Sequence, residues 1–193
     1  GQVVLVAGAP GIGKSRLTTE LKRYLAPKPV AVLEGACFTY SQPAYGVFLQ
    51  LLKALFGITG DDAEERVREK ITQTVRQLVP SQLVADVLPY IEYLFSLRLL
   101  DKDWASRIRH LAPPQLQQQT FLAVRELFVA QAQIKPLVLI LEDIHWIDQV
   151  SMELLRILLP VADQVPLVFY CNSRPTEGTA FAQMQKLGGE LYA

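Results

Sequence analysis

Eight residues near the start of the chain, GAPGIGKS at positions 8–15, constrain the fold more than any other segment. They match the phosphate-loop pattern, in which glycines let the backbone wind tightly enough for its N–H groups to surround a phosphate. The segment follows an apolar run rich in β-branched residues and precedes a run with leucines at helical spacing. Because a phosphate loop acts between a strand and a helix N-terminus, this context predicts a nucleotide-binding α/β domain.

Apolar runs and helical periodicities alternate near both ends of the chain. Buried strands are predicted at residues 3–7, 30–36, 137–141 and 167–171, and helices at 14–25, 47–56 and 151–159. Strands that alternate with helices predict a parallel sheet with right-handed crossovers, and such sheets bind ligands at the carboxyl ends of their strands. The phosphate loop falls at that edge.

The middle of the chain is expected to be a helical insertion at about residues 60–115. Its predicted helices begin with a charged amphipathic one at 61–78, opened by two acidic residues, and residues 83–100 predict one or two more. A further helix is predicted at 115–132. Prolines that cannot continue a helix are expected to divide this region, namely Pro80, Pro89, Pro113 and Pro114.

The phosphate loop carries the strongest candidate contacts. Lys14 would reach the β and γ phosphates of a nucleotide, and Ser15 would offer its hydroxyl to Mg²⁺. The alternative is a glycine-rich turn in which Lys14 is only a solvated residue at the start of a helix, and for Arg16 the alternative is an exposed helix position. The candidate nucleotide-binding residues are Gly8, Ala9, Pro10, Gly11, Ile12, Gly13, Lys14, Ser15 and Arg16.

Two neighbouring carboxylates, Glu142 and Asp143, follow the predicted strand at 137–141, as in a Walker B segment. Because Mg²⁺ prefers oxygen ligands and keeps several waters, Glu142 is expected to hold the ion through water while Asp143 polarises the attacking water. The usual order is Asp followed by Glu or Asp, so Glu142 departs from it and the division of labour stays open. Helix capping or pairing with a surface cation is the alternative.

Four further polar or aromatic residues lie near the predicted strand ends. His145 is interpreted as a hydrogen-bonded neighbour of the site, Trp146 as a packing residue and Asp148 as the N-cap of the next helix. Arg174, after the last strand, is a third catalytic candidate and a sensor of the γ phosphate, provided that this strand lies beside the first. An exposed loop arginine is the alternative.

Charge and composition disfavour several classes of partner. The chain has 19 basic and 19 acidic residues, so no positive excess recommends nucleic acid or an anionic membrane as the main partner. No apolar run reaches the roughly 18 residues of a membrane span. Cys37 and Cys171 each end an apolar run, which predicts buried free thiols and a reducing, cytoplasmic compartment.

Four segments together, GAPGIGKSRL, LEDIHWID, SMELL and NSRP, resemble the STAND branch of AAA-type ATPases. The chain is similar in particular to the modules beside bacterial adenylate or guanylate cyclase domains, Ser/Thr kinase domains and large LuxR-type regulators. The resemblance implies a P-loop NTPase fold of the ASCE/AAA type, a three-layer sandwich with a mostly parallel sheet and a helical insertion. It also implies ATP or ADP with Mg²⁺ as ligands.

By the same resemblance, the chain is expected to be a slow ATPase that serves as a nucleotide-dependent switch. Fused effector and sensor domains of the same polypeptide are the expected partners, with possible oligomer formation on activation. The chain is expected to be an excerpt of a longer protein, without the fifth strand and winged-helix region. The alternatives are a nucleotide-binding module without significant turnover and a DNA-associated initiator or loader ATPase.

Overall fold

The computed structural model describes residues 1–38, 43–175 and 182, and the chain divides into two units. The first unit comprises Gly1–Leu52 and Lys135–Ala193, and the second comprises Lys53–Ile134. All strands of the described residues belong to the first unit, whereas the second contains only helices. The predicted helical insertion at about residues 60–115 falls within the second unit. None of the described helices combines the length and the apolar character needed to span a membrane.

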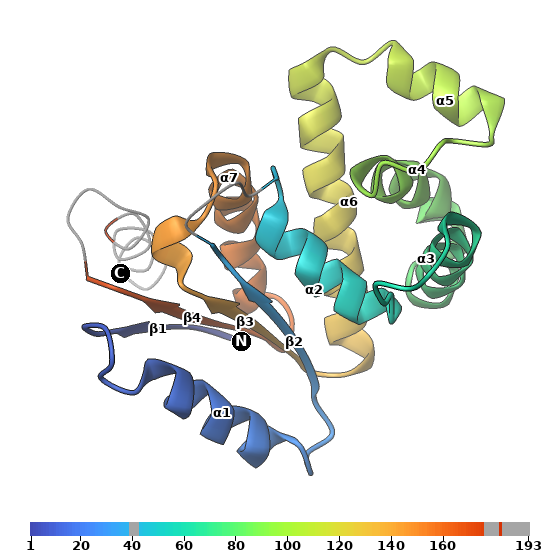
Figure 1. The fold of residues 1–193 in the computed structure, drawn as a ribbon. Coiled ribbons are helices and arrows are strands. Elements are labelled where there is room, and N and C mark those ends of the chain that lie inside the picture. Colours follow the sequence, from blue (N-terminus) through green and yellow to red (C-terminus); the bar gives the residue numbers. More distant parts are fainter. Residues whose placement is uncertain (39–42, 176–181, 183–193) are drawn as a thin grey trace. The chain divides into compact units, whose positions relative to one another are not determined.

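Within its described residues, the first unit is built around four parallel strands in the order β1-β4-β3-β2 (Figure 1). Their bounds are Gln2–Ala7 for β1, Ala31–Ala36 for β2, Leu137–Glu142 for β3 and Leu167–Ser173 for β4. Each predicted strand is confirmed to within two residues at either end. The order also confirms the condition that the last strand lies beside the first.

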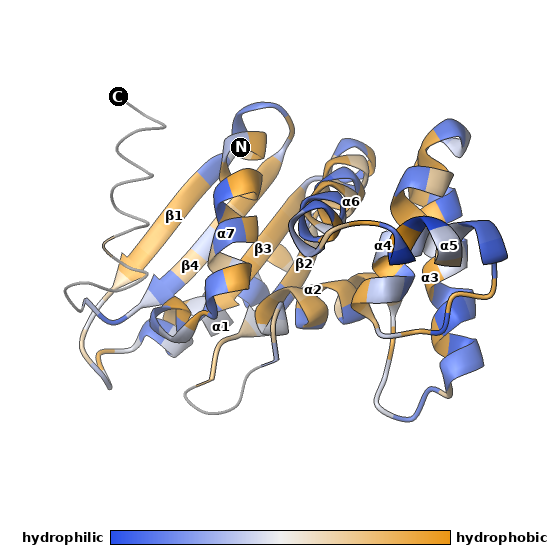
Figure 2. Ribbon diagram, turned by 90° about the horizontal axis from the view of Figure 1, so that it is seen from above, coloured by the Kyte–Doolittle hydropathy of each residue, from blue (hydrophilic) through white to orange (hydrophobic). Residues whose placement is uncertain are grey.

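Helices cover both faces of this sheet, which gives the unit three layers. The helix α1 (Lys14–Leu25) lies on one face and α7 (Gln149–Leu158) on the other (Figure 1). Apolar side chains fill the α1 side: Leu21 and Leu25 of the helix pack against a buried cluster of Val138, Ile140 and Tyr170. Figure 2 shows β1 and β3 as hydrophobic along most of their length, and β3 is buried from Leu137 to Leu141, as expected for a strand covered on both faces.

The start of α2 (Gly46–Phe56) packs closely against β2. A Cβ atom on Gly35 would lie 2.8 Å from the carbonyl oxygen of Val47, so only glycine allows this approach. The Gln50 side chain accepts a hydrogen bond from the Ala36 N–H at 3.1 Å and donates one to the Ala36 carbonyl at 2.8 Å. The amide thus replaces a strand partner at the exposed edge of β2.

The second unit consists of four α-helices and one short 3₁₀ turn, in addition to the end of α2. Their bounds are Glu64–Leu78 for α3, Ser81–Leu83 for the 3₁₀ turn η1, Val84–Leu94 for α4, Lys102–Arg109 for α5 and Pro113–Ile134 for α6. The helix α4 packs against both α3 and α6. Fully buried apolar side chains from all three helices form the core of the second unit: Ile71, Val75, Ile91, Val124, Leu127 and Phe128.

Pro89 corrects one expectation for this region, because it lies inside α4 and does not divide two helices. Proline in a helix interior costs about 3 kcal/mol, and here packing against α3 and α6 offsets that cost. The predicted helical segment at 83–100 also ends earlier, at Leu94. Beyond it the chain turns at Ser96, whose φ of 56° lies in the left-handed region.

The helix α5 was not expected from the sequence. It begins after Asp101, whose carboxylate accepts hydrogen bonds from the N–H groups of Asp103 and Trp104 at 2.9 and 3.0 Å. A carboxylate at this position caps the helix and also favours its positive end. The segment is only eight residues long and mostly polar, so few apolar positions mark it as a helix.

The helix α3 begins at Glu64, three residues later than expected. Asp62 lies before it and accepts a hydrogen bond from Lys70 at 2.6 Å, which lowers the pKa of the Asp62 carboxyl to about 2. Lys70 also donates to the Gly57 carbonyl at 2.7 Å. The turn between α2 and α3 is therefore fastened by Lys70.

Replacing Leu139 with alanine tests the contribution of the central strand β3. Leu139 is fully buried, so the change should lower the free energy of unfolding by about 2–5 kcal/mol through lost contacts and the cavity left behind. Urea denaturation measures this effect. The control is Val4→Ala in β1, which is 37% exposed and should cost about 1 kcal/mol or less. Equal losses would contradict the burial assigned to β3.

Candidate functional site

The carboxyl ends of β1, β3 and β4 meet at one edge of the sheet. The register pairs Ala7 with Ser173 across β1 and β4, and Leu141 with Cys171 across β3 and β4. The Gly8 N–H continues the first pairing by donating to the Ser173 carbonyl at 3.3 Å. The phosphate loop after β1, the carboxylates at the end of β3 and Arg174 after β4 are thereby brought to the same edge.

The phosphate loop depends on two glycines with positive φ, Gly11 at 78° and Gly13 at 107°. A Cβ atom at either would meet nothing within 4 Å, so the backbone conformation, not space, requires glycine here. Gly13 is the N-cap of α1 and provides no side-chain cap. Because the first N–H groups of a helix lack partners within it, this helix start has donors to offer to an anion.

Lys14 folds back over the loop. Its Nζ donates to the Gly8 carbonyl at 2.9 Å and to the Ala9 carbonyl at 3.2 Å. The ammonium group therefore lies beside the loop backbone, in contrast to the solvated side chain of the alternative interpretation. Ser15 and Arg16, the next two residues, are exposed on the first turn of α1.

Asn172 joins the ends of β4 and β3 and is the main residue that the sequence interpretation missed. Asn172 is only 2% exposed. Its Nδ2 donates to Glu142 Oε1 at 3.2 Å, and its Oδ1 accepts from the Asp143 N–H at 2.7 Å. The available signal was an amide near the end of an otherwise largely apolar strand, since a buried amide normally has hydrogen-bond partners.

Asp143 begins a tight turn after β3. Its φ of 53° and ψ of 43° lie in the left-handed region, which Asp, Asn and Gly enter at lower cost than other residues. The 3₁₀ turn η2 (Ile144–Trp146) follows directly. The Asp143 side chain remains 48% exposed, so its carboxylate faces solvent at the sheet edge.

His145 lies close to an acidic residue, Asp143, and to a basic residue, Arg174. Its side chain is 5% exposed, and Nδ1 accepts a hydrogen bond from the Arg174 N–H at 3.4 Å. Burial lowers the pKa of His145; Asp143 opposes this shift, and the charges of Arg174 and Lys14 add to it. The ring is therefore neutral at neutral pH, and Lys14 and Arg174 both lie within its electrostatic reach.

The expectation that His145 is a hydrogen-bonded neighbour of the candidate site is confirmed by this contact with Arg174. Its Nε2 is buried and has no partner among the described residues. Arg174 itself is exposed after β4. Arg174, Asp143 and Lys14 all act electrostatically on His145, and the exposure of Arg174 also fits the alternative of a loop arginine.

The predictions for Trp146 and Asp148 have different outcomes. The interpretation of Trp146 as a packing residue holds in part, because its ring packs at an angle on His145 with ring centroids 4.9 Å apart, although the residue is 41% exposed. Asp148 is confirmed as the N-cap of α7, since its carboxylate accepts from the Ser151 N–H at 2.9 Å and from the Ser151 hydroxyl at 2.6 Å.

Both cysteines are free and buried, as the sequence predicts. Cys37 follows β2, where its N–H donates to the Glu142 carbonyl at 2.9 Å. Burial raises the pKa of each thiol to about 12, with Asp148 and Asp143 contributing at Cys37 and Cys37 contributing at Cys171. Neither thiol supplies a nucleophile at neutral pH, because only the thiolate is reactive.

Comparison with known proteins assigns the chain to a family. The family model of the AAA ATPase domain matches residues 1–170, and the chain belongs to this family. It carries the P-loop NTPase fold, in agreement with the all-parallel sheet and the loop geometry. Family membership indicates ATP binding.

One similar protein is an uncharacterized protein of Rhizobium meliloti (strain 1021). It is 26% identical over 184 residues, a match that covers 91% of this chain and 16% of that protein. The chain therefore spans about 16% of the length of this relative.

Replacing Asn172 with alanine tests the link between β4 and β3. The change removes the partners of the Glu142 carboxylate and of the Asp143 N–H, so the free energy of unfolding should fall by about 1–3 kcal/mol in denaturation measurements. Tyr170→Phe on the same strand is the control, because the buried Tyr170 hydroxyl has no partner among the described residues and its removal should cost nothing. A larger loss for Tyr170→Phe would contradict this assignment.

Proposed function

We propose that the chain binds ATP with Mg²⁺ at the carboxyl edge of its sheet and hydrolyses it slowly as a nucleotide-dependent switch in a longer signalling protein. The observation that carries the proposal is the convergence of the phosphate loop after β1 and the carboxylates of β3 on either side of β4. The family match supports the nucleotide-binding part of the proposal.

The phosphate loop and the start of α1 would bind the phosphates. The N–H groups of the loop, from Gly8 to Gly13, and of the first helical turn supply donors without a side-chain cap. Lys14 donates to the Gly8 and Ala9 carbonyls. With nucleotide bound, it would donate instead, or in addition, to oxygens of the β and γ phosphates. The phosphate oxygens are charged acceptors, and hydrogen bonds to charged groups are stronger than those to neutral groups.

The oxygen donors at this edge suit Mg²⁺. Ser15 offers a hydroxyl on α1, and Glu142 offers a carboxylate whose Oε1 is held by Asn172. Both are hard oxygen ligands of the kind that this ion binds, either directly or through its waters. When bound, Mg²⁺ neutralises charge on the phosphates. Asp143, with its exposed carboxylate, is proposed to orient and polarise the attacking water.

Arg174 is proposed to sense the γ phosphate. Its N–H donates to Nδ1 of the neutral His145 ring, and Asp143 Oδ1 lies 3.9 Å from the same nitrogen. A movement of Asp143 on hydrolysis would therefore be transmitted through the rigid His145 ring to Arg174, at the start of the segment after β4. A nucleotide can shift such an equilibrium only through its different affinities for two states.

The switch role rests on the resemblance to the STAND branch and on the length of the relative, of which this chain spans 16%. Fused effector and sensor domains, and an oligomer on activation, are the proposed partners of the whole protein. The buried, free cysteines are compatible with the cytoplasmic location that we propose.

A nucleotide-binding module without significant turnover is the second candidate. Glu142 stands where the usual order has Asp, and its carboxylate is already engaged by Asn172. If that contact keeps Glu142 from its metal, nucleotide binding would persist while hydrolysis would not. The two substitutions below separate these possibilities.

Replacing Lys14 with alanine tests nucleotide binding. Loss of the ammonium removes a charged partner of the phosphates, which costs about 2 kcal/mol or more and should weaken ATP affinity by at least about thirtyfold. Isothermal titration calorimetry with ATP and ADP in the presence of Mg²⁺ measures this change. The control is Lys28→Ala, a lysine that lies over the Tyr24 ring and away from the loop. Equal affinities of the wild-type chain and Lys14→Ala would rule out the proposed site.

Replacing Asp143 with asparagine tests hydrolysis. Asparagine also tolerates the left-handed backbone, so the turn should persist while the rate of phosphate release falls about 100-fold or more. Single-turnover assays on saturated protein measure this rate, with Asp61→Asn at an exposed position as the control. An unchanged rate would remove Asp143 from the mechanism, and no measurable rate in the wild type would favour the binding module.

A further inference from the structure

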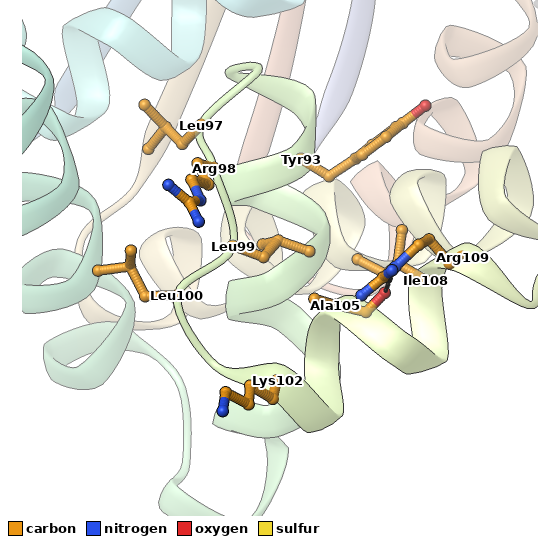
Figure 3. Close-up of a pocket in the computed structure, with 9 residues that line it drawn as sticks. All are labelled: Tyr93, Leu97, Arg98, Leu99, Leu100, Lys102, Ala105, Ile108 and Arg109. Carbon is orange, nitrogen blue, oxygen red and sulfur yellow. Dashed lines mark hydrogen bonds between the residues drawn. The ribbon is translucent and has the colours of Figure 1, made fainter.

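A pocket of about 520 Å³ lies in the second unit, outside the candidate nucleotide site. It is formed by the end of α4, the following segment at residues 97–100 and one side of α5 (Figure 3). Its volume falls within the range of about 300–1,000 Å³ that ligand pockets occupy. Nothing in the nucleotide chemistry proposed above uses these residues.

Apolar side chains form much of this pocket, and two of them are unusually exposed. Leu100 is 68% exposed and Tyr93 is 45% exposed. Figure 3 shows Leu99 extending from the segment after α4 towards α5, where Ala105 and Ile108 lie. The small side chain of Ala105 leaves room at the centre of the helix face. Exposed apolar side chains gathered around a hollow are typical of a docking surface.

The charged residues that line the pocket are all basic: Arg98, Lys102 and Arg109. None of the three forms an ion pair with a carboxylate within the part of the chain that the structure describes. The nearby Asp101 carboxylate is engaged with the N–H groups at the start of α5. The pocket therefore presents positive charge that its own lining does not neutralise.

The spacing of the cations indicates what can satisfy them together. Lys102 and Arg109 are seven residues apart on α5, so they lie on the same side of the helix and about 10 Å apart along it. A single carboxylate cannot contact both. Carboxylates seven residues apart on a second helix have the same spacing, and the apolar side chains between them would face Ala105 and Leu99.

We infer that this pocket docks an acidic amphipathic helical segment, whose apolar side chains enter the hollow while its carboxylates pair with Arg98, Lys102 and Arg109. Helices with apolar anchors at positions i, i+3, i+4 and i+7 commonly bind grooves in this way. Opposite charges on the two surfaces fix the register and speed the encounter. The partner is thus defined by alternating leucine-like and acidic side chains at helical spacing.

Fluorescence anisotropy with a labelled synthetic peptide tests this inference on the intact chain. The peptide carries leucines at i, i+3, i+4 and i+7 and glutamates at flanking positions spaced seven apart. We expect saturable binding that weakens as salt rises, because exposed charges are screened. The double variant Lys102→Glu/Arg109→Glu should bind at least about tenfold more weakly. The double variant Lys53→Glu/Lys135→Glu, at two exposed lysines elsewhere, is the charge-matched control and should bind like the wild type.

A second variant tests the hollow itself. Ala105→Trp fills the pocket without changing its charge, and should also weaken binding at least about tenfold while circular dichroism and thermal unfolding remain as in the wild type. A peptide with its leucines replaced by serine should bind at least about tenfold more weakly than the original. Absent binding, equal binding of the serine peptide, or unaltered affinity in the double variant would each overturn the inference. Saturable binding of dodecanoate without peptide binding, abolished by Ala105→Trp, would assign the pocket to a small anionic amphiphile instead.

Discussion

The position of β4 between β1 and β3 is the constraint on which the candidate site depends. Adjacent strands lie about 4.8 Å apart, so the ends of β1 and β3 are separated by about 10 Å across the sheet. This gap separates the donors of the phosphate loop from the carboxylates Glu142 and Asp143 by a distance that a phosphate chain and a hydrated cation can bridge.

Buried polar groups help to hold this edge in place. The Asn172 amide fixes Glu142 and the backbone of Asp143, and the His145 ring holds the N–H of Arg174. Because a buried polar group without a partner costs free energy, these contacts stabilise the edge. The strained conformation of Asp143 persists because its surroundings determine it.

The sequence predicted the sheet well and the second unit less well, for identifiable reasons. Buried parallel strands are continuous apolar runs, and the loop motif located the first of them, so the bounds of β1 to β4 needed little correction. In contrast, Pro89 suggested a break inside α4 because tertiary packing cannot be read from one proline. The role of Asn172 was missed since its partners are about 30 residues away in the chain and only strand order brings them together.

The two hydrogen bonds that Lys14 makes to the phosphate loop have a consequence for how readily an anion is captured. A lysine side chain carries about 2 kcal/mol of rotamer entropy, which is lost when a flexible ammonium becomes fixed on a ligand. Here the loop's own carbonyls already hold the side chain across its backbone. Much of that ordering is therefore complete before any ligand arrives, and the site is preorganised by contacts within a single turn.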